Sequence, residues 1–220
     1  MVALLAVAGC AASRAVAPLP QGAVAGQVSL GGPLLVFGGT PLPVPLTAIG
    51  AGYGVTDRLG VHGAIHPTGL ILLGVVGLDL GAAYELFPPK GARPRLMGDL
   101  TLSAFAGDTS ADGAPFGVRV FPEAQLVASW DLGDRRHHPY VGLDLFTDPL
   151  PTPAAYLSPM IGFELQASRR LGLQLEGKWI APYASNIPNF VDWIGVSHQG
   201  GISVQLGGTW HFGDIEGGTP

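Results

Sequence analysis

The sequence has little cysteine and little charge. Cys10 is the only cysteine in 220 residues, so no disulfide bond can form within the chain. Charged residues make up 12% of the chain, about half the share found in a typical soluble domain. The formal net charge is −5, and no stripe of lysine and arginine is present, which argues against a nucleic-acid-binding protein.

The chain also lacks the long apolar run of a membrane-spanning helix, although its mean hydropathy is high at +0.37. The longest apolar run covers residues 69–78 and ends at Asp79, whereas a spanning helix needs about twenty residues. A chain this apolar that has no spanning helix can cross a membrane only with strands.

Strand-like alternation is what the sequence has instead. In residues 171–180, Leu173 and Trp179 fall on one parity, and Glu176 and Lys178 fall on the other. Because successive side chains of a strand point to opposite faces, this segment has one apolar and one polar face. Two further segments alternate in the same way: residues 161–168 and 202–212. Repeated segments of about ten alternating residues are typical of a transmembrane β-barrel.

We predict an all-β fold, a single antiparallel up-and-down transmembrane β-barrel over residues 23–213, followed by a tail at 214–220. The predicted strands are approximately 23–30, 45–55, 59–66, 70–86, 95–106, 116–132, 138–146, 154–168, 171–181 and 199–212. Their number, ten, is even, as is usual in bacterial single-chain barrels. Eight strands are the alternative, if the first or the third segment is not a strand.

Basic residues concentrate in every second connection between the predicted strands. Seven of the eleven lie there: Arg58, Lys90, Arg93, Arg135, Arg136, Arg169 and Arg170. These connections are also the shorter ones, so we assign them to the periplasmic end of a barrel in the bacterial outer membrane. Four aromatic residues of outward parity lie near the same end and predict an interfacial girdle: Tyr53, Tyr84, Trp130 and Trp210.

The first ten residues are small and apolar and end in Val7-Ala8-Gly9-Cys10, which resembles a bacterial lipobox. That resemblance implies a signal peptide over residues 1–10 and a lipid anchor on Cys10; the alternative is an ordinary signal peptide with an incidental cysteine. Residues 11–22 are rich in alanine and proline and predict a flexible tether.

Residues 52–60 (Gly-Tyr-Gly-Val-Thr-Asp-Arg-Leu-Gly) resemble the strand–turn–strand motif of several uncharacterised outer-membrane β-barrel families. The phenol-degradation-like channels are among them. The resemblance implies a hairpin of the barrel wall, and by extension a channel for small apolar molecules.

Alternation alone does not say which face is outside. A soluble lipocalin-like barrel would turn the apolar face inward, but the polar face here is sparse and the loops are apolar. With the apolar face outward, eight charged residues face the lumen: Asp79, Asp99, Arg119, Glu123, Asp144, Glu164, Glu176 and Lys178. Because a ten-stranded barrel is narrow, we predict a packed polar network. The six-to-two excess of acids suggests a weakly cation-selective pore as the alternative.

No strong catalytic motif is present. Ser197-His198 with Asp192 is the nearest arrangement to a hydrolase site, but adjacent strand residues point to opposite faces. His62 and His66 share the inward face, yet residues four apart on a strand are about 13 Å apart, too far to chelate one metal ion. We therefore predict no enzyme, no metal and no cofactor, with a lipid-modifying barrel enzyme as a distant alternative.

The predicted function is a structural or interaction role for a lipid-anchored outer-membrane barrel. Its surroundings are outer-membrane lipid, and its partner surface is the apolar connection over residues 182–198. The side chains proposed for that surface are Ile187, Phe190, Trp193 and Ile194. The alternative is a narrow pore or transporter for small apolar solutes.

Overall fold

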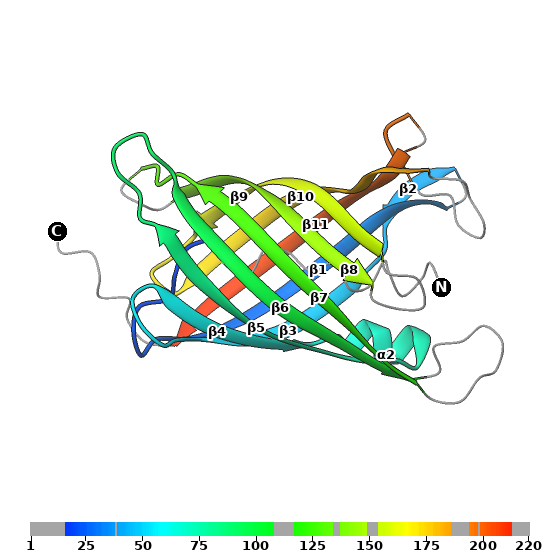
Figure 1. The fold of residues 1–220 in the computed structure, drawn as a ribbon, viewed down its shortest axis with the longest axis horizontal. Helices are drawn as coiled ribbons and strands as arrows, with labels where there is room; N and C mark the ends of the chain where they lie inside the picture. The colour runs from blue at the N-terminus through cyan, green and yellow to red at the C-terminus, as the bar shows by residue number, and fades with distance from the viewer. Residues whose placement is uncertain are drawn as a thin grey trace.

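A computed structural model describes residues 16–37, 39–107, 117–133, 137–148, 154–185, 194–197 and 199–212. The strands are β1 (Val24–Phe37), β2 (Thr40–Pro43), β3 (Leu46–Gly54), β4 (Leu59–Ile65), β5 (Val76–Phe87), β6 (Arg95–Gly107), β7 (Gly117–Ser129), β8 (His137–Asp148), β9 (Ala154–Gln166), β10 (Leu171–Ser185) and β11 (Gln199–Phe212). One helix, α2 (Pro67–Leu73), is described among them (Figure 1). It is too short to cross a membrane, and the described residues contain no other helix that is long enough and apolar enough to do so.

Ten of these strands form a closed antiparallel barrel, and β2 is an extra strand paired with β1 alone. Neighbours in the barrel are neighbours in sequence, and β1 pairs with β11 from Val24↔Phe212 to Pro33↔Ser203, which closes the sheet. The predicted all-β, up-and-down barrel of ten strands is therefore confirmed. The end with the short connections after β3, β5 and β9 is called the turn end below, and the opposite end is called the loop end.

The predicted strand over residues 70–86 is partly wrong, because its first residues belong to α2. Pro67 lies in the first turn of this helix, where its missing N–H costs nothing, and Gly74 ends the helix at φ 65°. The apolar run over residues 69–78 does not distinguish a strand from a buried helix. The helix follows β4, which ends at Ile65, so Thr47 in β3 has no partner in β4. Its backbone N–H donates a hydrogen bond (3.0 Å) to Thr68 Oγ1 of the helix instead.

The segment over residues 31–44, expected to be a loop, forms a hairpin extension at the loop end. β1 continues to Phe37 and pairs with β2 from Leu34↔Pro43 to Phe37↔Thr40. Proline is tolerated in β2 because this strand has a partner on one side only, so no second ladder requires its N–H groups.

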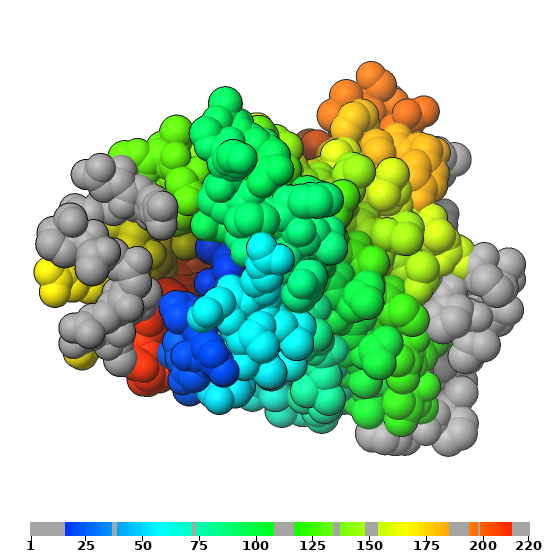
Figure 2. Space-filling model, turned by 60° about the vertical axis from the view of Figure 1, so that its left-hand side comes forward, coloured from blue at the N-terminus to red at the C-terminus, as the bar shows by residue number. Residues whose placement is uncertain are grey.

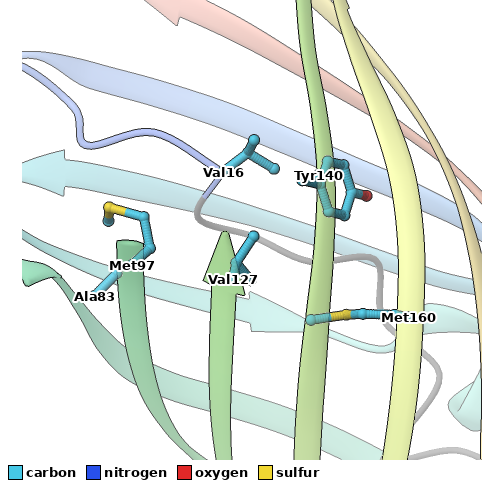
Figure 3. Packing of buried hydrophobic residues seen from close by; sticks show 6 residues of the cluster. All are labelled: Val16, Ala83, Met97, Val127, Tyr140 and Met160. Carbon is cyan, nitrogen blue, oxygen red and sulfur yellow. The ribbon is translucent and has the colours of Figure 1, made fainter. Parts of the chain in front are cut away.

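Residues 16–22 fall in the expected flexible tether, and we call them the strap: residues 16–19 are buried or half-buried, and residues 20–22 are exposed at the turn end. Val16 is 2% exposed and joins a buried cluster with Met97, Val127, Tyr140 and others (Figure 3). The hydroxyl of Ser129, itself fully buried, donates a hydrogen bond of 2.9 Å to the carbonyl oxygen of Val16. In Figure 2, which brings the turn end forward, the blue strap lies beside the red end of β11.

Two glycines of β3 leave room for the strap. A methyl group on Gly54 would overlap the backbone oxygen of Pro20, and one on Gly52 would lie 3.1 Å from the Leu19 side chain. The backbone N–H of Gly22 donates to Gly54 O (2.8 Å), and the N–H of Gly54 donates to Ala23 O (2.9 Å). The strap is thus held by backbone hydrogen bonds at the turn end and by apolar packing inside the lumen.

Candidate functional site

The lumen of the barrel contains a buried ion cluster on β8 and β10. Lys178 Nζ lies 2.8 Å from Asp144 Oδ2 and 3.9 Å from Glu176 Oε1, and all three residues are at most 2% exposed. The Tyr140 hydroxyl donates to Glu176 Oε2 at 2.8 Å and accepts from Gln174 Nε2 at 2.6 Å. Three of the charged residues predicted for the lumen are therefore brought together, and Tyr140 extends the cluster.

Two other predicted acids are paired with histidines. His66 Nε2 lies 2.6 Å from Asp79 Oδ2, and His62 Nε2 lies 2.7 Å from Asp99 Oδ2. Thr101 Oγ1 donates to the second oxygen of Asp99 at 2.7 Å. Each histidine thus has a carboxylate of its own. In the described part of the chain, no group of three or more His, Cys, Asp and Glu residues is arranged to hold a metal ion.

The remaining predicted lumen residues are less buried. Glu123 accepts a hydrogen bond from Gln125 Nε2 at 2.7 Å, Arg119 lies half-buried at the loop end of β7, and Glu164 lies half-buried on β9.

An ion network at the turn end was not predicted from the sequence. Arg95 Nε lies 3.0 Å from Glu85 Oε1, and Arg95 Nη1 lies 3.0 Å from Asp131 Oδ1. His138 Nδ1 lies 3.1 Å from the same oxygen of Asp131. The sequence shows that Glu85, Arg95 and His138 have inward parity. Parity does not show which of the inward side chains lie close enough to form ion pairs.

Toward the loop end, three phenyl rings form an apolar layer across the lumen. The ring centroids of Phe105 and Phe121 are 5.9 Å apart, and those of Phe121 and Phe146 are 5.2 Å apart. Val75 packs in the same cluster, and His66 is in ring contact with Phe105 at 5.3 Å. These rings come from consecutive strands, β6, β7 and β8, where strand pairing places inward side chains side by side.

A small cavity lies in the lumen next to Glu164 and Gln174. It has a volume of about 30 Å³, room for about two water molecules. Small residues of β3, β4 and β11 line it together with polar residues of β1, β9 and β10: Ala48, Gly50, Ala64, Gly207, Gly208, Gln27, Ser29, Glu164 and Gln174.

Outward-facing side chains of the same strands are apolar and exposed. On β6, Leu100 is 69% and Leu102 is 55% exposed, while the alternate residues Asp99, Thr101 and Ser103 are buried. The exposed apolar residues include Val28, Ile49, Val61, Leu78, Leu80, Leu100, Leu102, Val120, Leu126, Val141, Leu143, Leu145, Leu157, Ile161, Leu173, Leu175, Val204 and Leu206. A continuous apolar band around a polar interior suits hydrocarbon and not water.

The molecule is an outer-membrane β-barrel. The soluble lipocalin-like alternative needs the apolar face inside, and the buried acids on the lumen side exclude it. At the turn end, Tyr53, Tyr84 and Trp210 of the predicted girdle point outward and are 44–46% exposed. Trp130, the fourth, directly follows β7 and is half-buried.

Several residues singled out from the sequence lie outside the described part of the chain. They are Cys10, Ile187, Phe190, Asp192, Trp193 and His198. Ile194 is described: its N–H donates to Leu34 O at 3.0 Å, and its carbonyl accepts from Ile202 N–H at 2.7 Å. It therefore belongs to the wall of the loop end, next to the β1–β2 extension.

No protein-family model and no curated protein matches the chain. Among solved structures, it is similar to an outer-membrane channel from Pseudomonas putida F1, with 13% identity and a TM-score of 0.48 over 91% of this chain and 99% of that one. It is also similar to the translocator domain of the autotransporter NalP from Neisseria meningitidis, with 11% identity and a TM-score of 0.46 over 86% and 88% of the two chains. A third similar structure is the outer-membrane protease OmpT from Escherichia coli, with 11% identity and a TM-score of 0.32 over 87% and 94%.

Proposed function

We propose that this outer-membrane barrel is closed along its axis and has a structural or interaction role, without enzymatic activity. The observation that supports the proposal is the filling of the lumen by the chain's own residues. The Val16 cluster lies in the half of the lumen toward the turn end, and the Phe105–Phe121–Phe146 layer lies toward the loop end. Asp144 of the Lys178 cluster lies on β8 between Tyr140 and Phe146, and its partner Lys178 lies on β10.

Each layer opposes the passage of ions in a different way. The phenyl layer offers no polar group to replace the water that an ion would lose. In the Lys178 ion cluster, Lys178 is already paired with Asp144 and Glu176, so these carboxylates are poor transient partners for a passing cation.

The loop end supports the interaction role. Exposed apolar side chains gather there on the β1–β2 extension, on α2 and beside β11: Val36 and Leu42, Leu70 and Ile71, and Val196. Ile71 is 78% exposed, which is unusual for an isoleucine outside the lipid-facing band. Together with the predicted surface at Ile187, Phe190, Trp193 and Ile194, these residues would offer an apolar face to a partner protein.

The lipid anchor belongs to the same proposal. Cys10 precedes the first strap residue by six positions, a reach of about 20 Å when extended. Gly22 lies at the turn end and is also six positions from Val16, so a segment of this length can extend from Val16 back to that end. The intact mass of the mature protein tests the anchor: acylated Cys10 as the first residue is expected, and an unmodified N-terminus at any other residue would contradict it.

Single-channel recording in a planar bilayer tests the closed lumen. We expect inserted wild-type protein to produce no conductance steps above the baseline. Heat-dependent gel mobility of the same preparation shows that the protein is folded, and a general porin added afterwards shows that the bilayer reports conduction. Steady ohmic steps from the wild-type protein would contradict the proposal and favour the narrow pore.

A further inference from the structure

Among the residues that the structure describes, positive charge outside the lumen is confined to the turn end. The described lysines and arginines that do not face the interior are all exposed there, and we call them the basic rim: Arg58, Lys90, Arg93, Arg169 and Arg170. Arg119 and Lys178 point into the barrel, and Arg95 belongs to the buried network at the same end. On the outer surface of the loop end, the described residues include no lysine or arginine.

Three described carboxylates at this end have partners outside the rim. Asp57 accepts the backbone N–H of Gln21 at 3.1 Å, and Glu85 and Asp131 both bind Arg95. Among the rim cations, Arg58 approaches Glu85 at 3.9 Å, and Arg93 donates to the carbonyl oxygen of Pro88 at 2.9 Å. Lys90, Arg93 and Arg169 have no described carboxylate within ion-pair distance. The rim therefore presents a surplus of positive charge to its surroundings.

Strand register places this surplus just beyond the exposed aromatic rings. Tyr84 pairs with Leu59, the residue after Arg58, and Trp210 pairs with Leu171, the residue after Arg170. One strand residue rises about 3.3 Å along the strand, so the rim begins about one to two residues, or about 3–7 Å along the strand, beyond the rings. Aromatic residues at membrane interfaces lie at the level of the lipid headgroups. The guanidinium and ammonium groups therefore reach the level of the headgroup phosphates.

We propose that the basic rim binds the phosphates of anionic phospholipids in the leaflet at the turn end, which gives the barrel a preference for phosphatidylglycerol-type lipid. Arginine recognises phosphate by paired hydrogen bonds, and a lysine or arginine near an anionic surface contributes attraction. The backbone carbonyls of Arg58 and Arg170 accept hydrogen bonds at 2.8 Å from Glu85 and His211, so two rim residues are held on the barrel ladder. This inference does not depend on whether the lumen is closed.

Tryptophan quenching by brominated lipids tests the proposal. The full chain is refolded into phosphatidylcholine vesicles that contain a small fraction of brominated phosphatidylglycerol, or of brominated phosphatidylcholine for comparison. The test variant is Lys90→Gln/Arg93→Gln/Arg169→Gln. The control variant is Thr40→Ala/Gln199→Ala, which changes exposed polar residues at the loop end. Heat-dependent gel mobility verifies that all three proteins are folded.

We expect the wild type and the control to favour phosphatidylglycerol about fivefold or more, because roughly 1 kcal/mol per rim cation corresponds to about fivefold. The test variant should lose most of that preference, and salt at about 0.5 M should reduce it in the wild type by screening. No preference in the wild type, or an undiminished preference in the test variant, would overturn the inference. Loss of the preference on adding inorganic phosphate at constant ionic strength would assign the rim to free phosphate instead.

Discussion

Lys178→Met is expected to lower the free energy of unfolding by about 3–5 kcal/mol, because it leaves two buried carboxylates without their cation. Asp144 and Glu176 are each 1% exposed, and Lys178 Nζ lies 2.8 Å from the first and 3.9 Å from the second. Methionine keeps most of the side-chain volume, so the loss of stability would come from the missing positive charge and not from a cavity. Urea unfolding of the vesicle-embedded barrel, followed by tryptophan fluorescence, measures the change.

Two companion variants separate the contribution of the Lys178 charge to stability from the contributions of Tyr140 and Asp144. Tyr140→Phe removes only the hydroxyl that donates to Glu176 at 2.8 Å, and should cost about 1–3 kcal/mol. Lys178→Met/Asp144→Leu replaces an ion pair with apolar side chains and should recover part of the stability lost in the single variant. A Lys178→Met protein as stable as the exposed-site variant Gln199→Ala would contradict a structural role for the cluster.

The barrel itself was predictable because its signal is local. Alternation along one strand, such as Leu173 and Leu175 against Gln174 and Glu176, depends only on the pleat of that strand and on one face meeting lipid. Up-and-down topology then follows from short connections. Helix α2 was missed because a short apolar run fits a helix and a strand equally well, and proline and glycine at its ends decided the outcome.

The composition of the lumen was predictable, but its pairings were not. Inward parity identified Asp79, Asp99 and Lys178 as facing the interior, whereas a pair between next-but-one strands, such as Lys178 on β10 with Asp144 on β8, depends on register and strand tilt. His62 and Asp99 are 37 residues apart, and no sequence pattern connects them. The strap was unpredictable for a related reason. Its alanine- and proline-rich sequence has no periodicity, and its position depends on missing side chains at Gly52 and Gly54 of another segment.

Gly54→Ala is expected to displace the strap from the lumen, because the added methyl group overlaps the backbone oxygen of Pro20. Backbone atoms cannot move aside as the end of a flexible side chain can, so the hydrogen bonds between Gly54 and residues 22 and 23 must distort as well. Overpacking of this kind costs about 1–3 kcal/mol. Gly60→Ala is the matched control: Gly60 pairs directly with Gly54, and its added methyl group would meet only the Tyr53 oxygen at 3.5 Å, an ordinary contact.

Maleimide labelling of Val16→Cys in a Cys10→Ser background measures the position of the strap directly. Val16 is 2% exposed, so the introduced thiol should be protected when the strap is in place and in the Gly60→Ala control. In the Gly54→Ala protein we expect labelling about 5- to 150-fold faster, since a loss of about 1–3 kcal/mol in strap docking raises the open population by that factor. Equal labelling in the two glycine variants would mean that the strap is not held by the β3 glycines. Fast labelling in all proteins would mean that Val16 does not occupy the lumen, and the closed barrel would then lose the layer nearest its turn end.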